Sequence, residues 1–414
     1  MVKERKRIPM NNTQTTILNL IKASLNPAAN QGSIDIQDYD ALLQELNAQS
    51  IVGIPGEFIV SSDSTPESEK QQWTNIVYSQ VAEWTKLMEA QEKLIKLLND
   101  NNIPLAIIKG SAAAMYYPKP EYRSMGDIDF FVKAEDFEKA HDLLLKSDYK
   151  YVKDEDYAKL QKEKDEYHHV EFKKRGITFE LHKRMSETVQ GNEMDHRVDQ
   201  MIMDGMNHIQ MGRVGQYEFP MFEKKLNGLI ILRHIIQHLG ETKPIGLRHV
   251  IDWMMFVREN VDDAFWDSEY ADYLDAVNLK DAAITFARMS QIYLGLDETI
   301  AWCKKANDQL CKDWMEQILA SGNFGRKNKK QEEGANVFYR NKNIFAMFKS
   351  LQGLGLKHWE PARKHIILRP FAWAYQICRY AKKGLGRKNP VRSLKTDMAK
   401  SKSKKELMDR LNIN

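Results

Sequence analysis

The spacing of apolar residues predicts helices at both ends of the chain and strands in the middle. In the first hundred residues, apolar positions recur every three to four residues, as on one face of a helix, over 15–23, 36–48 and 64–100. Pro66 and Glu67 are typical of a first helical turn, and the polar run NDNN ends the third of these helices. We therefore expect a helical region over residues 1–100.

The period then shortens to that of β-strands. The runs PLAIIK (104–109) and DIDFFVK (127–133) predict two short buried strands, with helices at 111–117 and 134–147. Apolar and polar residues alternate in 168–173 and 177–182, on both sides of a turn that contains a glycine, which predicts a β-hairpin. Residues 101–185 are thus expected to form a small mixed sheet.

From residue 195 onward the pattern predicts helices again, most clearly over 226–240, 247–259 and 264–294. The expected fold class is α+β, with a small mixed-sheet core flanked by N-terminal helices and a helical C-terminal domain. This division gives four regions: N-terminal helices (1–100), the sheet core (101–185), a second helical region (186–324) and a tail (325–414).

Composition is globular, but the charge is divided between two parts of the chain. The 414 residues are 43% hydrophobic and 29% charged, and a net charge of +4 argues against a histone-like protein as a whole. Residues 325–414, however, carry 23 Lys and Arg against 6 Asp and Glu, whereas the preceding residues carry 38 against 51. An acidic body is therefore followed by a strongly basic tail.

Three features favour a cytoplasmic protein. Three scattered cysteines are too few for a disulfide framework, which favours a reducing compartment. The basic N-terminus is not followed by the apolar segment of a secretory signal, and no run of about 20 apolar residues could span a bilayer. We expect a cytoplasmic location, with association at the inner face of the membrane as an option for the tail.

The predicted sheet core holds the residues with the most chemical information. Asp127 and Asp129 are two positions apart at the start of a strand, so they share a face and form a natural site for a hard cation. Gly110 and Ser111 lie at a strand-to-helix turn, where backbone N–H groups attract an anion. Glu180, on the second hairpin strand, is the best candidate for a third carboxylate that binds metal or accepts a proton.

This ordered set of motifs resembles the nucleotidyltransferase core of the DNA polymerase beta superfamily. More narrowly, the layout KG…Y…R…GDIDFFV…FELH resembles a family of uncharacterised bacterial nucleotidyltransferases with a helical C-terminal half. The resemblance is best over residues 103–185 and continues to about residue 258. The loop Tyr117–Met125 makes the segment between the glycine–serine pair and the first aspartate longer than in most of the superfamily.

The resemblance implies a role for each matched residue. Gly110 and Ser111 would bind the phosphates of a nucleotide, and Asp127 and Asp129 would bind one or two Mg²⁺, with Mn²⁺ as an alternative. Glu180 would be the third acid. The implied reaction is the transfer of a nucleoside monophosphate from an NTP, ATP first among them, to an acceptor.

Two cations near these motifs are candidates for binding the triphosphate. Lys109 ends an apolar strand beside the glycine–serine turn, although a lysine at a strand end also commonly extends its amine to solvent. Arg123 would bind phosphate or brace its loop, and it could instead pair with the two aspartates when no metal is bound.

His182, His234 and His238 are candidates for an acceptor pocket. His182 shares a strand face with the third acid, and the other two lie four residues apart on one helix face. Ordinary packing between helices or under the sheet is the competing interpretation. Arg248 and Asp252, also four apart, are expected to pair with each other, and no spacing supports a zinc site.

The basic tail alternates cations with aromatic residues. Residues 361–392 read PARKHIILRPFAWAYQICRYAKKGLGRKNPVR, which suits an anionic membrane surface. RNA is a less favoured partner, and a packed helix with a solvated end is the plain alternative.

The acceptor stays open at this stage: a small molecule, a sugar or glycolipid intermediate, a protein side chain or tRNA. The tail makes a glycan or lipid pathway at a membrane the first hypothesis. Two competing functions are a non-catalytic nucleotide-binding scaffold and a toxin-like enzyme that modifies tRNA.

Overall fold

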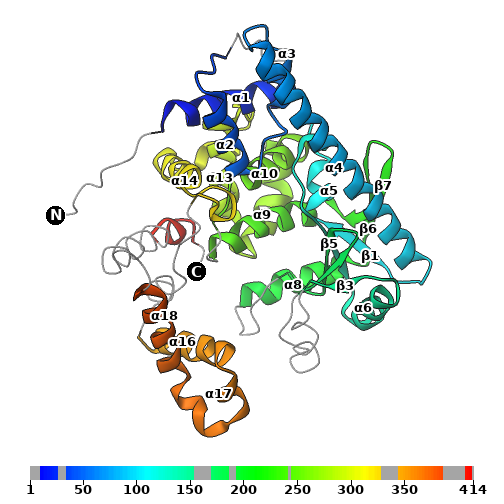
Figure 1. Ribbon diagram of the computed structural model, residues 1–414, viewed down its shortest axis with the longest axis vertical. Helices are drawn as coiled ribbons and strands as arrows, with labels where there is room; N and C mark the ends of the chain where they lie inside the picture. The colour runs from blue at the N-terminus through cyan, green and yellow to red at the C-terminus, as the bar shows by residue number, and fades with distance from the viewer. Residues whose placement is uncertain are drawn as a thin grey trace, which may run out of the picture. The chain divides into compact units, whose positions relative to one another are not determined.

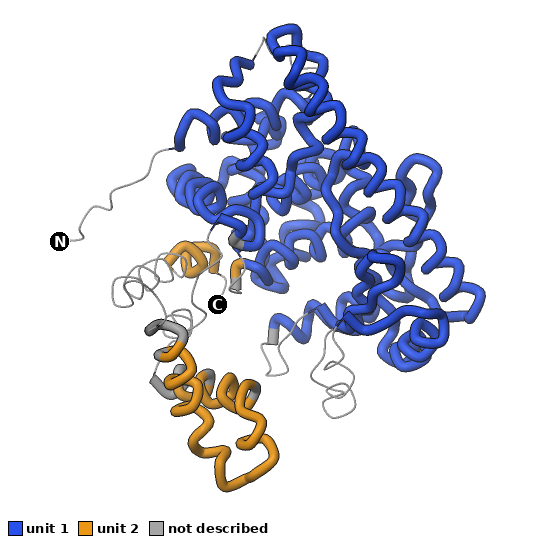
Figure 2. The backbone as a smooth tube through the Cα atoms, viewed as in Figure 1, with its two compact units in different colours: residues 1–238, 244–327 blue, residues 239–243, 328–414 orange. Residues whose placement is uncertain are grey.

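The computed structural model describes residues 10–26, 34–152, 169–185, 193–240, 244–327, 344–385 and 406–412. The chain divides into two units (Figure 2): residues 1–238 with 244–327 form unit 1, and residues 239–243 with 328–414 form unit 2. Unit 1 contains the sheet, and the described parts of unit 2 are helical, so the α+β class is confirmed. The division into four regions stays a prediction. His168, residues 328–336 at the start of the tail and residues 386–392 lie outside the described residues.

Four helices precede the sheet: α1 (Asn12–Leu25), α2 (Tyr39–Gln49), α3 (Gly56–Ser61) and α4 (Glu67–Asn99). The spacing predicts all of them except the short α3. The first begins at a capping box, in which the side chain of Asn11 accepts from the backbone N–H of Gln14 at 2.9 Å and the side chain of Gln14 accepts in return. The 33-residue α4 runs along the sheet (Figure 1).

The seven strands form one mixed sheet in the order β3-β4-β5-β2-β1-β7-β6. Their bounds are β1 (Leu105–Ile108), β2 (Asp127–Val132), β3 (Lys150–Tyr151), β4 (His169–Lys174), β5 (Ile177–His182), β6 (Ile209–Val214) and β7 (Tyr217–Phe222). The expected hairpin is β4–β5. Strand β2 is antiparallel to β1 and parallel to β5, so the two central strands of the predicted core lie side by side with the hairpin.

The second hairpin, β6–β7, corrects the expectation that residues after 195 are only helical. It follows α8 (Glu193–Gly205) and joins the sheet through a parallel pairing of β7 with β1. The signal was present as the alternation RVGQYEFPMF, with a turn at Gly215, whose φ of 57° is the left-handed conformation that glycine tolerates.

The expected helix over 264–294 is also divided in the structure. It consists of α11 (Asp263–Phe265), a π-helical turn η3 (Trp266–Tyr270), α12 (Ala271–Asp275) and α13 (Lys280–Leu294). Asn278, with φ of 54°, reverses the chain between the last two, and asparagine is one of the few residues that adopt this conformation readily.

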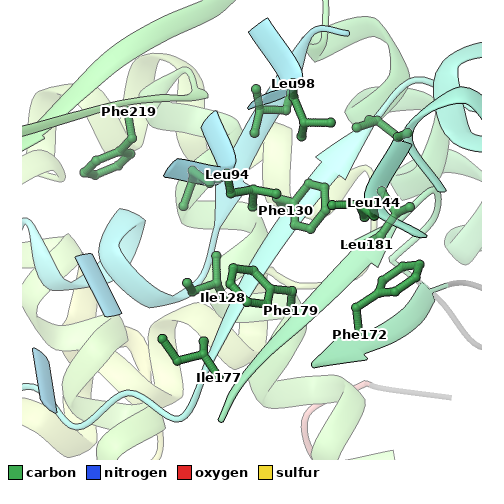
Figure 3. Packing of buried hydrophobic residues seen from close by; sticks show 14 of the residues in the cluster. Leu94, Leu98, Ile128, Phe130, Leu144, Phe172, Ile177, Phe179, Leu181 and Phe219 are labelled. Atoms are coloured by element: carbon green, nitrogen blue, oxygen red, sulfur yellow. The ribbon is translucent and has the colours of Figure 1, made fainter. Parts of the chain in front are cut away.

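One face of the sheet packs against α4 and α6 (Phe137–Lys146). Alternate residues of β2, Ile128 and Phe130, point into this core, where Leu94 and Leu98 of α4 and Leu144 of α6 meet them (Figure 3). Because side chains alternate along a strand, Asp127 and Asp129 must project from the opposite face. The same pattern that builds the core thus places the acids together on the other side.

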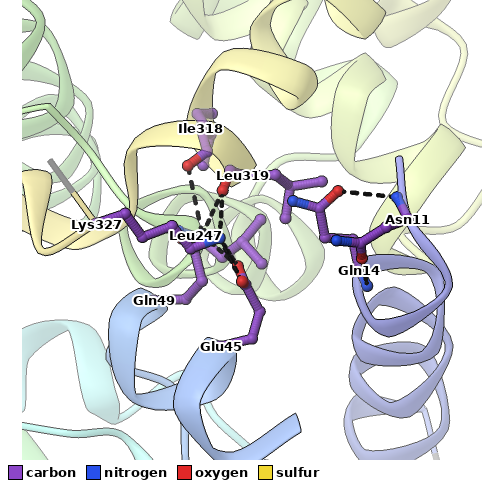
Figure 4. A network of polar contacts seen from close by, with 8 residues as sticks. All are labelled: Asn11, Gln14, Glu45, Gln49, Leu247, Ile318, Leu319 and Lys327. Carbon is purple, nitrogen blue, oxygen red and sulfur yellow. Dashed lines mark hydrogen bonds and ion pairs between the residues drawn. The ribbon is translucent and has the colours of Figure 1, made fainter. Parts of the chain in front are cut away.

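Helices α9 (Lys224–Gly240) and α10 (Leu247–Asn260) follow the second hairpin. The start of α10 is fixed by α2 and α14 (Asp308–Ser321): the backbone N–H of Leu247 donates to the Gln49 side chain at 3.0 Å, and Gln49 donates to the carbonyl of Ile318 at 3.4 Å (Figure 4). Lys327 and Glu45 form an ion pair beside them (Figure 4). This network sets the position of the first turn of α10.

The short elements of unit 1 are α5 (Gly110–Ala114), η1 (Pro120–Tyr122), η2 (Ala134–Asp136), η4 (Trp302–Lys305) and η5 (Asn323–Gly325). Unit 2 contains α16 (Ile344–His358), α17 (Glu360–Lys364), η6 (Ile366–Phe371) and α18 (Ala372–Leu385). Helices α16 and α18 pack closely, because a Cβ atom at Gly355 would lie 1.9 Å from the carbonyl oxygen of Ala372. Among the described residues, no helix has both the length and the apolar character that crossing a membrane requires.

Candidate active site

Three carboxylates converge on the face of the sheet that is opposite the core. Parallel pairing sets Asp129 directly beside Glu180, and Asp127 precedes Asp129 on the same face of β2. Oxygen atoms of the three side chains lie within 4.8 Å of one another. The structure therefore brings together the three acids that the sequence singled out, although they lie up to 53 positions apart along the chain.

Burial and mutual repulsion make this cluster costly to ionise fully. Burial, followed by the charges of Asp129 and Glu180, raises the pKa of Asp127 to about 7. Burial and the charge of Asp129 likewise raise the pKa of Glu180 to about 7. Such a concentration of hard oxygen donors with excess negative charge fits a Mg²⁺ ion, which takes carboxylate and phosphate oxygens.

Asp129 is the exception because two side chains donate to it. The Lys109 Nζ lies 2.7 Å from Oδ1 of Asp129, and Nε2 of His182 lies 2.9 Å from the same oxygen. Burial favours the neutral carboxyl, but Lys109 and His182 outweigh it and lower the pKa of Asp129. Burial is likewise outweighed for Lys109, whose pKa is raised by Asp129 and Glu180. One lysine thus compensates part of a three-carboxylate charge.

The backbone of Lys109 adopts an unusual conformation, with φ of 55° and ψ of −121°. Few residues other than glycine adopt this region, and holding one there costs about 1–3 kcal/mol. Lys109 forms the turn between β1 and α5, so the strained turn directs its side chain back over the sheet to Asp129.

Gly110 and Ser111 form the first turn of α5, as expected. The N–H groups of a first helical turn have no acceptor within their own helix, so they are available to a substrate. The Ser111 hydroxyl is not available to a substrate, because the side chain is fully buried and donates to Oε1 of Gln91 on α4 at 2.7 Å. Any contact of Ser111 with a phosphate would therefore come from its backbone.

Comparison with protein families agrees with this geometry. The model of a family described as uncharacterised nucleotidyltransferase matches residues 35–295, which include the sheet, the three acids and helices α9 and α10. The chain belongs to this family. No curated protein matches it.

Arg123 of this nucleotidyltransferase contacts α10, which fits the loop-bracing role that the sequence suggested. Its guanidinium is buried and makes two bonds of 2.7 Å to the carboxylate of Asp252 on α10. Tyr117 donates to the same carboxylate at 2.7 Å. The alternative pairing of Arg123 with Asp127 or Asp129 is not formed. The bonds of Tyr117 and Arg123 to Asp252 tie the loop Tyr117–Met125 to α10 near both of its ends.

Arg248 consequently lacks the partner that helical spacing predicted. Instead of pairing with Asp252, it donates to the carbonyl of Ser124 at 3.0 Å, and its Nε has no hydrogen-bond partner within the described part of the chain. Burial and the charge of Arg123 lower the pKa of Arg248. Its bond to Ser124, three positions before Asp127, places the guanidinium near the acids, where its charge opposes part of the rise in the pKa of Asp127 that burial causes.

His234 and His238 belong to a cluster of three histidines with His249 of α10. The Nε2 atoms of the first two are 2.8 Å apart, and the ring centroids of the three lie 4.6 to 5.5 Å from one another. Burial and then the charge of Lys109 lower the pKa of His234, which places this cluster beside the acid site. Sequence reasoning missed His249, since its spacing from the other two depends on how α9 and α10 cross.

Of the three histidines predicted for the acceptor pocket, His182 makes direct contacts with the acids. It is buried, with Nε2 3.3 Å from Oε2 of Glu180 as well as 2.9 Å from Asp129. Burial and the charge of Lys109 lower the pKa of His182, so the ring orients the two carboxylates as a neutral imidazole. His169, on the neighbouring strand, packs against it with ring centroids 5.0 Å apart.

Proposed function

We propose that this nucleotidyltransferase is Mg²⁺-dependent and moves a nucleoside monophosphate from an NTP, ATP first among them, to an acceptor hydroxyl. The observation that carries the proposal is the set of three carboxylates on two adjacent parallel strands, with Lys109 as the nearest cation. Mn²⁺ would be accepted by the same oxygen donors.

Asp127, Asp129 and Glu180 would hold the metal. A divalent ion bound there supplies charge neutralisation for a triphosphate and polarises its α-phosphorus. Glu180, on the strand beside Asp129, would accept the proton of the acceptor hydroxyl. The acceptor oxygen then forms a bond to the α-phosphorus, the bond to the β-phosphate oxygen breaks, and diphosphate leaves.

Lys109 and the first turn of α5 would bind the phosphates that leave. The backbone N–H groups of Gly110 and Ser111 open this turn, and Lys109 immediately precedes them. Gly110 also permits the Met125 side chain to lie close to this turn, because a Cβ atom at position 110 would lie 3.1 Å from that side chain. Arg123 has no direct part in this proposal; it braces the 117–125 loop through Asp252.

His182, His234 and His238 remain our candidates for the acceptor side of the pocket. The charge of Lys109 acts on His234, which clusters with His238, so we infer that this part of α9 lies toward the acids. A sugar, lipid-linked or other hydroxyl compound would meet this wall as it approaches Glu180.

The test is transfer of label from α-³²P-labelled NTPs, with Mg²⁺ and fractionated acceptor pools, to any product other than the free nucleoside monophosphate that hydrolysis would release. Asp127→Asn and Asp129→Asn should abolish transfer, whereas Asp63→Asn, a change at an exposed aspartate of the same unit, should not alter it. Nucleotide binding without transfer in any pool would support the non-catalytic scaffold instead. Label that accumulates in RNA, with growth arrest that depends on Asp127, would identify the toxin-like alternative.

We further propose that unit 2 contacts an anionic membrane surface. The 3₁₀ turn η6 exposes apolar side chains, with Ile366 73%, Ile367 80% and Phe371 57% accessible. Residues 361–385 contain six Lys and Arg and no Asp or Glu. Apolar side chains that protrude among cations suit insertion at the headgroup level of anionic lipids.

Co-sedimentation with vesicles tests this partner. Full-length protein should pellet with phosphatidylserine-containing vesicles and not with pure phosphatidylcholine, and the double change Ile366→Asp and Ile367→Asp should abolish pelleting. Tyr78→Asp, at a side chain that is 69% exposed on α4, is the matched control. Equal pelleting of all variants would remove the membrane proposal, and selective retention of RNA would favour a nucleic acid.

A further inference from the structure

Two buried N–H donors at the start of α10 lack acceptors. His249 is 1% exposed, and its Nε2 has no hydrogen-bond partner among the residues that the structure describes. Nε of the adjacent Arg248 likewise has no hydrogen-bond partner in the part of the chain that the structure describes. A buried donor without an acceptor costs about 1–3 kcal/mol, so two neighbouring ones point to a group that binds there.

The tautomer of His249 is set by the turn that precedes it. The backbone N–H of Gly246 donates to Nδ1 of His249 at 3.3 Å, so Nδ1 must be the unprotonated nitrogen. The proton of the neutral ring then resides on Nε2, which is a donor. This argues against a metal at His249, because the Gly246 N–H occupies the lone pair of Nδ1 and the ring proton occupies Nε2.

The surroundings of His249 are cationic and rigid. Burial and then the charges of Arg248 and Arg123 keep the ring neutral by lowering its pKa. Phe324, held by a bond of 2.8 Å from its N–H to the carbonyl of Pro244, packs edge-on against His249 with centroids 5.5 Å apart and lies 6.0 Å from the Arg248 guanidinium carbon. The donors are thus fixed in place by aromatic packing.

Arg248 links the two donors at the start of α10 to the acid cluster. Within the described residues Asp252 is bonded to Arg123 and no carboxylate forms an ion pair with Arg248, whose charge acts on the nearby Asp127. A ligand that satisfies both donors would need several acceptor atoms and negative charge, and it would lie beside the metal-binding carboxylates. A phosphate group has these properties, and arginine is the preferred residue for binding it.

We propose that Arg248 and His249 form a subsite for a phosphate group of a substrate of this enzyme. The proposal deepens the transferase function, on which it rests for its place in the reaction. The phosphate belongs either to the NTP or to a phosphorylated acceptor. In both cases Nε of Arg248 and Nε2 of His249 donate to its oxygens.

The test is calorimetric titration of the full-length protein with inorganic phosphate, in the absence of nucleotide. His249→Phe and Arg248→Gln should each weaken phosphate binding about tenfold or more, because each removes a hydrogen bond to a charged group. His249→Gln, which keeps an N–H donor at about the same reach, should bind within about threefold of the wild type. Far-UV circular dichroism and melting temperature identify any variant that fails to fold, and whichever of His249→Phe and Arg248→Gln folds then decides.

Further measurements identify the source of the phosphate and distinguish a failure of the subsite proposal from a failure of the transferase proposal. If a non-hydrolysable NTP with Mg²⁺ displaces inorganic phosphate, the subsite serves the triphosphate; if both bind together, it serves the acceptor. Asp127→Asn should abolish label transfer and leave phosphate affinity intact, so failure of the transferase function would not mimic failure of the subsite. Equal phosphate affinity in wild type, His249→Phe and Arg248→Gln would overturn the subsite, as would tight Zn²⁺ binding that is lost in His249→Phe.

Discussion

Replacing Asp127 by asparagine should stabilise the metal-free protein. Burial and the repulsion from Asp129 and Glu180 raise the pKa of Asp127 to about 7, so its ionised form is less stable in the folded than in the unfolded chain. Asparagine has nearly the same shape and no charge. The change therefore removes repulsion that only a bound cation would otherwise relieve.

The magnitude follows from the pKa. An ordinary aspartate has a pKa of about 4, and each tenfold change in proton affinity corresponds to about 1.4 kcal/mol, so ionised Asp127 destabilises the fold by at most about 4 kcal/mol. Asp127 retains some contact with solvent, which reduces this to about 2 kcal/mol. Between pH 4 and 7 the folded state binds more protons than the unfolded state, so the stability of the wild type falls as pH rises. The advantage of Asp127→Asn should grow over that range and stay constant above it.

The assay is urea unfolding in EDTA at pH 5, 6, 7 and 8, followed by tryptophan fluorescence. A second aspartate supplies a control of opposite sign. Asp252→Asn leaves the buried guanidinium of Arg123 without its counter-charge and should lower the free energy of unfolding by about 3–5 kcal/mol. Mg²⁺ should stabilise the wild type and have little effect on Asp127→Asn. A destabilised Asp127→Asn protein at pH 8, or an effect that is the same at every pH, would refute this reasoning about the carboxylate cluster.

Three further results are expected. Mg²⁺ affinity, measured by calorimetry, should rise from pH 6 to 8, because protons compete for Asp127 and Glu180, whose pKa values are raised to about 7; a flat profile would contradict this. Ser111→Ala should lower the free energy of unfolding by about 1–3 kcal/mol in urea titration, since it leaves the buried Gln91 acceptor unsatisfied, and an unchanged value would count against that bond. Tyr117→Phe should cost about 1 kcal/mol in the same assay by removing the bond to Asp252, unlike Tyr78→Phe at an exposed position.

Sequence reasoning worked best where local periodicity and chemistry coincide. In β2 the alternation that buries Ile128 and Phe130 also sets Asp127 and Asp129 on one face, so a strand assignment is enough to pair the two acids. The hairpin places Glu180 on a strand of the same sheet. The second hairpin was missed because its alternation is short and follows a helical stretch.

The cation positions could not be predicted, because they depend on which elements meet. Local spacing favours an Arg248–Asp252 pair on α10, yet Asp252 faces the 117–125 loop and binds Arg123, 129 positions away. The conformation of Lys109 is equally hidden, since nothing in its sequence context requires a positive φ. Long-range packing decides both.

The exchange of partners at Asp252 links the fold to the chemistry. Had Asp252 paired with Arg248, the loop that holds Arg123 would contain a buried, uncompensated cation, and the acids would face a neutral ion pair. Because Arg123 pairs with Asp252, a buried bidentate ion pair fastens the loop to α10. The guanidinium of Arg248 keeps its charge near Asp127, and its Nε has no hydrogen-bond partner within the described residues. A buried ion pair adds little net stability by itself, but here it determines which of two arginines stays available to an anion. The double change Arg123→Met and Asp252→Leu, which replaces the pair by apolar side chains, should therefore alter loop stability while preserving phosphate binding at Arg248 and His249.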